Sequence, residues 1–434
     1  ISQLSRSSTV YFLQEIEAGR FEVYFGDGVV SQSISDGNIV ELSYVVTNKT
    51  LANGASSFSS AGTIDTVTDI TLTTVANASG GTEGESLQSI KLNAPLDFAA
   101  QGRAVTTEDY RLYARKLFAN TSTVSVWGGE DGSYNTSSGV SATAEYGKVF
   151  ISIKSTTGEN LTTTQKDQLI KDLEPYKVAS ITPVIVDPET TSLILGITFS
   201  YDSSATTRTA TDLGSLIGIT LQSYNTTELN TFNAPFRHSQ LTGLIDDTDN
   251  SILMNTTTVT MAKLFTPTTT GSTSYTINFN NAFYNPVSGY QNTIIASTGF
   301  YINGGTTEYF FDDDGSGNLR IYSIAVGVRT YYSSTAGTVD YINGLIIING
   351  ILISSVSNID GVTSTQVRIT ALSDSNDVIP VRNQLLEIDF ANTTISSRVD
   401  AAATTGIGYT TTSSGTTTST SVNTTKSTTT SSSY

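Results

Sequence analysis

Residues 94–115 read APLDFAAQGRAVTTEDYRLYAR, and they differ sharply from the Thr-, Ser-, Asn- and Gly-rich sequence around them. Apolar residues recur at helical spacing on both sides of Gly102, which predicts two helices joined by a short elbow. Pro95 should end or kink the first helix, because it lacks an N–H and its ring clashes with the preceding turn. Thr106 should open the second helix, because its hydroxyl can accept from the third amide while Asp109 reaches back.

The two helices carry the first candidate functional residues. We expect the first helix over residues 85–98 and the second from Thr106, with Glu108 and Asp109 favourably placed at its positive N-terminal end. The predicted apolar face of the second helix comprises Tyr110, Tyr113, Ala114, Leu117 and Phe118. The following residues are candidates for fixing the elbow or contacting a partner, although they could simply cap a helix: Arg103, Thr106, Glu108, Asp109 and Tyr110.

Composition excludes several classes of function. The 434 residues include 22 Lys and Arg against 39 Asp and Glu, and the resulting net charge of −17 disfavours direct binding of nucleic acid. The absence of cysteine rules out thiol nucleophiles, disulfides and Cys-based zinc sites. The longest apolar run, residues 344–353, is shorter than the roughly 20 residues that span a bilayer. We therefore expect a soluble protein with no membrane partner. The chain starts with Ile1, which suggests that a preceding part is missing.

The order of predicted elements indicates a multidomain α+β protein. Strand, helix, strand, strand, helix and strand are expected at residues 149–153, 162–174, 181–186, 193–201, 213–224 and 252–261, with a short extra helix at 241–245. This β-α-β-β-α-β order is typical of a ferredoxin-like arrangement. The predicted regions are an N-terminal β region (1–78), the helix-elbow-helix (79–120), the ferredoxin-like α/β domain (121–265), a C-terminal all-β domain (266–400) and a Thr/Ser-rich tail (401–434). On composition the tail should be disordered unless a neighbouring subunit holds it.

An acidic stretch, Asp312-Asp313-Asp314-Gly315-Ser316-Gly317-Asn318, is similar to the start of a calcium-binding loop. Ser323 occupies the position where such a loop has its bidentate glutamate. Asp and Gly also favour turns, so we prefer a hairpin turn between two strands.

A second acidic cluster contains Asp246, Asp247 and Asp249. It could hold a cation or supply the carboxylate pair of a glycosidase. Solvated aspartates in a helix-to-strand loop are the simpler interpretation.

His238 is the single histidine and follows Arg237, just before the short predicted helix. A histidine with no visible acid or nucleophile partner is most often structural. We keep Arg237 as a further candidate interface residue.

The apolar run GLIIINGILI contains Asn349-Gly350, a pair typical of a type I′ hairpin turn. A buried strand pair around that turn and an exposed subunit contact are both open interpretations.

The stretch GGTEGESLQSIKLNAPLDFAAQGRAVTTEDYRLYAR resembles the signature of the baseplate J-like family, which includes the wedge subunit of T-even-type contractile-tailed phages. The similar positions are Gly81, Glu83, Glu85, Ser86, Ile90, Asn93, Ala94, Pro95, Arg103, Ala104, Val105, Thr106, Glu108, Asp109 and Tyr110. Pro183-Val184, the helix with Ser239 and Leu241, GTVDYINGLIIIN and SNDVIPVRNQLLEID also resemble the family.

The resemblance implies a structural protein of the virion tail baseplate, assembled in the host cytoplasm. Such subunits pair as dimers, join wedges into a ring around the tail hub that dilates on sheath contraction, and contact other wedge proteins and the sheath initiator. The family implies no catalytic residue, cofactor or metal. Two alternatives are a tail-associated glycan depolymerase using acidic pairs such as Asp246/Asp249 or Asp312/Asp314, and a Thr-rich surface adhesin.

Overall fold

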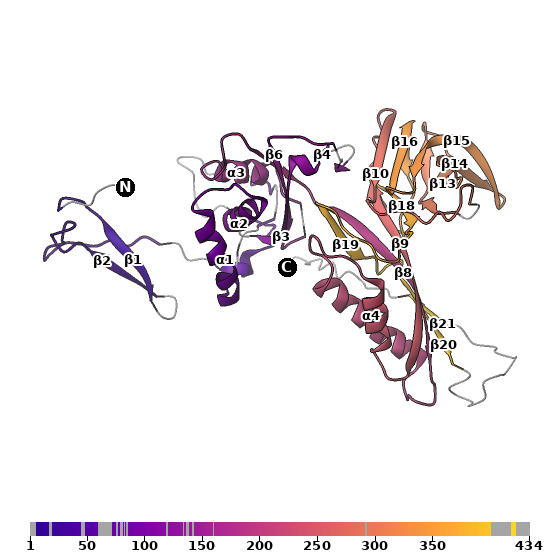
Figure 1. The fold of residues 1–434 in the computed structure, drawn as a ribbon, viewed down its shortest axis with the longest axis horizontal. Helices are drawn as coiled ribbons and strands as arrows, with labels where there is room; N and C mark the ends of the chain where they lie inside the picture. Colours follow the sequence, from indigo (N-terminus) through magenta and orange to yellow (C-terminus); the bar gives the residue numbers. More distant parts are fainter. Residues whose placement is uncertain are drawn as a thin grey trace. The chain divides into compact units, whose positions relative to one another are not determined.

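A computed structural model gives the architecture of most of the chain (Figure 1). It describes residues 6–16, 20–44, 48–59, 72–74, 77–78, 81, 83, 86–118, 120–132, 134–135, 139–140, 143–158, 160–290, 293–400 and 418–421. The chain forms two compact units, Ile1–Leu51 and Ala52–Tyr434. Helices and strands together confirm the predicted α+β class.

The N-terminal unit contains one antiparallel hairpin, formed by β1 (Tyr11–Ile16) and β2 (Arg20–Phe25). A short 3-10 helix, η2 (Lys49–Ala52), begins at its end. The chain turns at Asp27, whose carboxylate accepts from the backbone amides of Val29 and Val30 at 2.8 and 3.0 Å. No strand forms over the described residues 38–44, where further strand was expected.

The predicted helical pair begins the second unit. Helix α1 spans Leu87–Ala100 and helix α2 spans Thr107–Leu117. Of the two expected effects of Pro95, an end to α1 is wrong, since the helix continues for five residues beyond it, and a kink stays a prediction. Pro95 removes the bond to the carbonyl of residue 91, on a helix exposed enough for water to solvate that group. Gln101 and Gly102 then make the elbow with φ angles of 48° and 74°.

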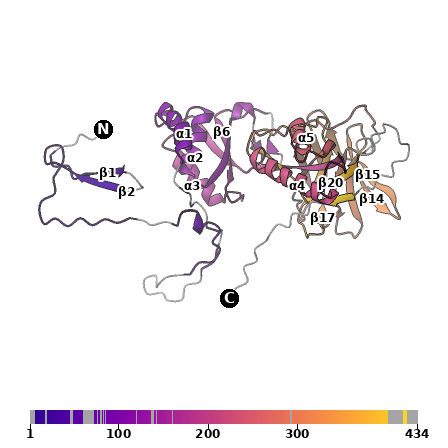
Figure 2. The same cartoon turned by 90° about the horizontal axis from the view of Figure 1, so that it is seen from below.

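Next comes a three-stranded sheet of β3 (Thr121–Gly128), β6 (Lys148–Ser155) and β7 (Thr182–Val186). Strand β6 is central, antiparallel to β3 and parallel to β7. Helices α2 and α3 (Thr163–Leu173) lie against this sheet (Figure 2). Their apolar side chains form a core with those of the strands. The segment between β3 and β6 also contains η3 (Gly129–Asp131), β4 (Tyr134–Asn135) and β5 (Gly139–Val140).

The rest of the second unit is built on a 14-stranded sheet. Its main path runs β10-β16-β15-β14-β13-β11-β18-β9-β8-β20-β21, while β12, β17 and β19 pair beside that path. The strands are β8 (Glu189–Tyr201), β9 (Ile252–Phe265), β10 (Thr273–Asn278), β11 (Ile295–Ser297), β12 (Phe300–Ile302), β13 (Glu308–Asp313), β14 (Asn318–Ala325), β15 (Val328–Asp340), β16 (Leu345–Ile351), β17 (Ile353–Val356), β18 (Val367–Leu372), β19 (Gln384–Ile388), β20 (Thr394–Val399) and β21 (Thr418–Ser421). Beyond Phe265 the described residues form strands and turns, in agreement with a C-terminal all-β region.

Two helices pack on the long strand β8. Alternate residues of β8 are buried, which is the expected pattern for a strand with one face in the core. Against that face lie α4 (Ala210–Thr227) and α5 (His238–Asp246), whose apolar side chains share its core. The interleaved helix and strand residues form a large hydrophobic cluster that continues into the C-terminal strands.

The ferredoxin-like prediction is wrong in topology, although the order of elements along the chain is correct. Strands β6 and β7 belong to the three-stranded sheet, whereas β8 and β9 belong to the large sheet. Strand β8 pairs with β9 and also with β19 and β20, which lie almost 200 residues further along the chain. The predicted limit at residue 265 falls inside this hydrogen-bonded sheet, and the other domain limits stay predictions.

The predicted hairpin around Asn349-Gly350 is also wrong. Strand β16 runs through both residues, and neither has the positive φ that a type I′ turn requires. Alternation along β16 buries Ile346 and Ile348 in the core. The apolar run is therefore an internal strand of the sheet, with β10 and β15 on its two sides.

The Thr/Ser-rich tail contributes one strand to the large sheet. Residues 418–421 form β21, antiparallel to β20, so the expectation of disorder is wrong for these four residues. The rest of the predicted tail, together with Glu85 of the predicted first helix, lies outside the described residues.

Candidate functional site: the elbow, the polar clusters and their partners

The predicted cap of α2 is confirmed. Asp109 N donates to Thr106 Oγ1 at 3.3 Å, and Asp109 Oδ2 accepts from the amides of Thr106 at 2.8 Å and Val105 at 3.0 Å. Burial raises the pKa of Asp109, but these hydrogen bonds outweigh it and hold the pKa below its ordinary value. The charged form of Asp109 is thus part of the folded elbow.

Tyr110 is a core residue and not a surface contact. Its ring is buried with Tyr113 and Ala114 between α2 and the three-stranded sheet. Burial raises the pKa of Tyr110, partly offset by the nearby backbone amide of Val178. The Tyr110 hydroxyl has no hydrogen-bond partner among the described residues that meets both the distance and the angle of a hydrogen bond. Tyr110 therefore anchors α2 from inside the domain.

The remaining two elbow candidates face outward. Glu108 pairs with Arg111 on its own helix at 2.7 Å, with 57% of the Glu108 side chain exposed, so the pair contributes little stability. The Arg103 backbone amide bonds to Ala100 at 2.9 Å. The exposed Arg103 side chain makes no ion pair with a described residue, which leaves it as the elbow candidate available to a partner.

Arg237 and His238 are tied to a distant loop of their own chain. Arg237 Nη1 pairs with Asp377 Oδ2 at 2.8 Å, and the His238 amide donates to Asp377 Oδ1 at 2.8 Å. The contact with Arg237, followed by that with His238, lowers the pKa of Asp377. His238 Nε2 lies 2.8 Å from the carbonyl of Thr257. Asp377 thus caps α5, and the structural interpretation of His238 is supported.

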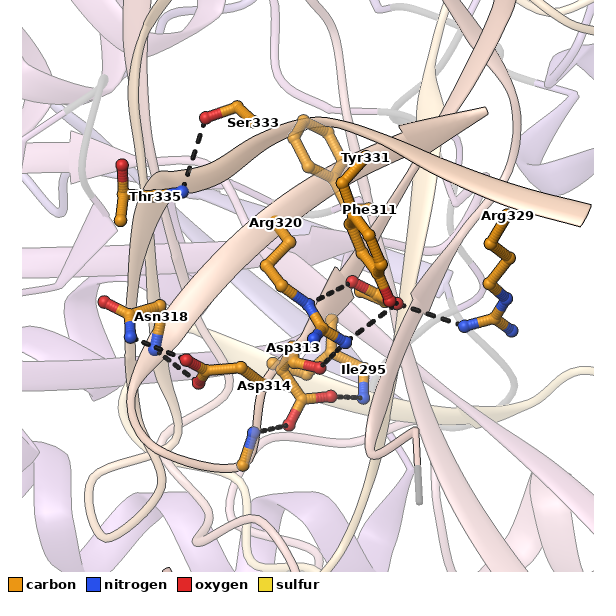
Figure 3. Close-up of polar contacts among 12 residues, drawn as sticks. Ile295, Phe311, Asp313, Asp314, Asn318, Arg320, Arg329, Tyr331, Ser333 and Thr335 are labelled. Atoms are coloured by element: carbon orange, nitrogen blue, oxygen red, sulfur yellow. Dashed lines mark hydrogen bonds and ion pairs between the residues drawn. The ribbon is translucent and has the colours of Figure 1, made fainter. Parts of the chain in front are cut away.

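The first acidic turn is a hairpin turn, as preferred from the sequence. It joins β13 to β14, and its first carboxylate, Asp312, is fully buried. Asp312 accepts from Arg320 Nε at 2.9 Å, Arg329 Nη1 at 3.0 Å and Tyr331 Oη at 3.2 Å. The Arg320 guanidinium also lies over the Tyr331 ring, 4.5 Å from its centroid (Figure 3). Two arginines therefore balance the charge of this carboxylate, and the tyrosine donates a further hydrogen bond to it.

The other two aspartates of the turn bind backbone and polar side chains. Asp313 Oδ1 accepts from the amides of Ile294 and Ile295, each at 3.0 Å, and Oδ2 accepts from Tyr341 Oη at 2.8 Å. Asp314 accepts from the amide and the side chain of Asn318 at 3.0 and 2.6 Å (Figure 3). These carboxylates join strands of the sheet to one another.

The second acidic cluster forms the predicted helix-to-strand loop between α5 and β9. Asp246 accepts from Asn255 at 2.7 Å. Asp249 accepts from the amide and hydroxyl of Ser251, and these bonds hold its pKa below the ordinary value. A glycosidase acid needs a raised pKa to remain protonated, which is the opposite direction.

A groove of about 800 Å³ lies between β8, β9 and β10. Its buried cation, Lys263, pairs with Glu189 at 3.0 Å and donates to the carbonyl of Asn278 at 2.7 Å. Both contacts tie β9 to its neighbouring segments. No group of three or more potential ligands for a metal occurs among the described residues. Within the same ranges, no helix is long and apolar enough to cross a membrane.

Two segments of the chain are similar to known proteins. Residues 106–186 match the model of the baseplate structural protein gp6, C-terminal domain I, and residues 193–264 match C-terminal domain III. The baseplate wedge protein gp6 of Enterobacteria phage T4 is 25% identical over 279 residues, which cover 59% of this chain. This chain is similar to the T-even-type baseplate wedge protein. The similarity supports a structural role and a location in the tail baseplate of the virion.

The matched segments follow the division between the two sheets. The first match ends at Val186, the last residue of β7, and the second begins at Leu193, within β8. The chain spans 40% of the length of the T4 protein. The boundary between the two matched domains therefore lies between β7 and β8. The structure also divides the predicted ferredoxin-like block there, because these two strands belong to different sheets.

Sequence reasoning missed the partners that hold these clusters. Arg320, Arg329 and Tyr331 surround Asp312, and Asp377 caps α5 from 140 residues away. Alternation along the strands after the acidic turn could have placed Arg320 opposite Asp312, since these two residues are directly paired in the hairpin. No local signal marks Asp377 as a partner of Arg237.

Proposed function

We propose that this chain is a structural subunit of the baseplate wedge in a contractile phage tail. In this role it pairs with a second copy and helps to link wedges into the ring around the tail hub, which dilates when the sheath contracts. Other wedge proteins and the sheath initiator are its further partners, and assembly takes place in the host cytoplasm. The observation that carries the proposal is the similarity to the wedge protein across segments of both sheets.

The chemistry of the described side chains supports a non-enzymatic role. Asp312, Asp313 and Asp249 all use their carboxylates to fix backbone or to neutralise arginine. Arg237 and His238 are likewise engaged within the fold. Groups that satisfy one another in this way stabilise an architecture, and the surfaces of that architecture are then available for assembly.

We propose that the elbow residues have different roles. Thr106, Asp109 and Tyr110 set the direction in which α2 leaves the elbow, because they fix its first turn and its core contact. Arg103 contacts a partner from the exposed side of the same elbow. Glu108 pairs with Arg111 on its own helix and Arg237 pairs with Asp377 of a distant loop, and neither ion pair is needed for assembly.

Self-association can be tested on the full chain by light scattering coupled to size-exclusion chromatography. The proposal predicts a particle of twice 46.1 kDa. A monomer at every concentration would contradict the pairing.

Co-expression with the other wedge proteins of the same virus tests the proposed binding to these partners, because the chain should co-purify with them as one complex. Release of reducing sugar from host surface glycans by the purified chain would instead favour a depolymerase.

A further inference from the structure

The hairpin of β14 and β15 extends beyond the strands on either side of it. Strand β13 pairs with β14 only as far as Ser323, and β16 pairs with β15 only from Gly337 onward. Residues 324–328 therefore form a projecting tip, in which the two-residue turn Val326-Gly327 joins the two strands. We call these five residues the β14–β15 tip.

The turn in this tip contains an unusual residue for its backbone conformation. Val326 and Gly327 have φ angles of 52° and 76°, and turns of this kind normally have Asn, Asp or Gly in the first position. Two other turns beyond Phe265 follow that rule, with Asn303-Gly304 at 52° and 72° and Asp360-Gly361 at 53° and 79°. Among the described non-glycine residues with positive φ, Val326 is the one β-branched residue, and its conformation is sterically unfavourable.

Burial does not offset this unfavourable conformation. Val326 is fully exposed, and the neighbouring apolar residues Ile324 and Val328 are 53% and 65% exposed. Unfavourable backbone conformations of this kind cluster at functional sites. An apolar side chain that is both strained and in water therefore indicates a binding role for the tip.

The base of the tip is held in place by stacked side chains. The Arg329 guanidinium, next to the tip, lies 4.5 Å from the centroid of the Tyr322 ring. The Arg320 guanidinium lies 4.5 Å from that of Tyr331 (Figure 3). Both arginines also pair with the buried carboxylate of Asp312 on β13. These contacts join three strands, so the tip is ordered before it meets a partner, which lowers the entropic cost of binding.

We infer that the β14–β15 tip inserts into a concave apolar pocket of a different baseplate protein, an inference that rests on the proposed function. Val328 pairs with Ala325, the neighbour of Ile324, so the side chains of Ile324 and Val328 lie on opposite faces of the hairpin. Apolar side chains therefore surround the tip, and a concave partner is needed to cover them all. Residues 321–328 include no charged side chain, so apolar burial should drive the contact.

A second copy of this chain fits the tip less well. Grooves of about 800, 670, 500 and 430 Å³ in the described part of the chain all contain charged side chains, among them Lys263, Asp97, Arg368 and Lys154 respectively. An uncharged apolar tip would remove water from these groups without offering them a new partner, which is unfavourable. The pocket that receives the tip therefore belongs to another protein and is lined by apolar side chains.

Co-expression of the full chain with the other wedge proteins of the same virus tests the inference. Val326→Asn supplies a residue that the turn favours and removes the apolar side chain. It should raise the midpoint of thermal unfolding of the chain alone, yet lower the yield of the co-purified complex about tenfold. Ile324→Ser with Val328→Ser should lower the yield similarly without changing the turn. Val362→Asn, at an exposed valine beside the Asp360-Gly361 turn, is the matched control and should leave the yield unchanged.

The possible outcomes separate the inference from the proposed function. Equal yields with the parent chain and Val326→Asn, or a lowered unfolding midpoint in this variant, overturn the inference alone. Self-association that is lost in Val326→Asn overturns it in favour of a second copy. Co-sedimentation of the parent chain, but not of Val326→Asn, with phosphatidylcholine vesicles overturns it in favour of a lipid surface. A parent chain that forms no complex with the wedge proteins overturns the proposed function, and the inference with it.

Discussion

Helices α1 and α4 contain similar apolar residues but differ in how far those residues are buried. In α4, Leu213, Ile217 and Leu221 recur every four residues and are completely buried against β8. In α1 the large apolar side chains face water, and polar Ser89 and Asn93 face the domain. The difference shows that apolar side chains of a helix contribute to the core in one region and stay exposed in the other.

The same contrast holds for charged side chains. Asp312 and its two arginines are used inside the large sheet, where they hold β13, β14 and β15 together. Lys91 of α1 and Arg103 of the elbow are exposed and make no ion pair with a described residue. Substitutions in the two regions should therefore separate folding from assembly, and the following predictions run from the largest effect to the smallest.

Ile217→Ala should lower the free energy of unfolding by about 4 kcal/mol, because it leaves a cavity between α4 and β8. Chemical denaturation measured by circular dichroism gives the value. A loss below about 1 kcal/mol would mean that α4 is no more buried than α1, and the comparison would fail.

Asp312→Ala should cost about 3 kcal/mol, because it leaves Arg320 and Arg329 beside a buried site without their counter-charge. The matched control is Asp249→Ala, at an aspartate whose partner Arg208 is half exposed, with an expected loss of about 1 kcal/mol or less. Stability that rises on addition of calcium in the parent but not in Asp312→Ala would revive the metal-site interpretation.

Asp109→Ala should cost about 1 kcal/mol at neutral pH, through loss of the reciprocal cap of α2. The folded state holds the pKa of Asp109 below its ordinary value, so the charged carboxylate stabilises the fold above about pH 4. This contribution is lost as the pH falls through the lower folded pKa, and parent and variant should converge there. Denaturation at several pH values measures the difference, with Glu108→Ala as the exposed control. A difference that grows toward acid pH would contradict the role of the charged cap.

Leu92→Ala should change the free energy of unfolding by less than about 0.5 kcal/mol, because this side chain is largely in water. Denaturation of this variant beside Ile217→Ala makes the comparison on one scale. A loss of about 2 kcal/mol or more would show that Leu92 is covered within the chain itself.

Local patterns in the sequence were sufficient for the elbow and insufficient for the sheets. Thr106 and Asp109 are three residues apart, and their reciprocal bonding follows from helix geometry alone. The pairing of β8 with β20 joins residues 196–201 to 394–399, and nothing within either strand specifies that partner. The ferredoxin-like expectation failed because the order of elements was read as one sheet.

The candidate residues show the same division. The turn at Asp312–Asn318 was preferred correctly from its Asp and Gly content, yet the arginines that neutralise Asp312 could not be assigned without the hairpin register. The hairpin predicted at Asn349-Gly350 was wrong because this pair, although typical of turns, lies within β16, which is hydrogen-bonded to β10 and β15. Long-range pairing overrode the local propensity there.

The position of the chain in the intact tail tests the central claim most directly. Electron cryomicroscopy of tails from the virus that encodes it should reveal the 14-stranded sheet and the three-stranded sheet in the baseplate ring around the tail hub. Density for this chain in a fibre or on the capsid, or its absence from the tail, would contradict the account.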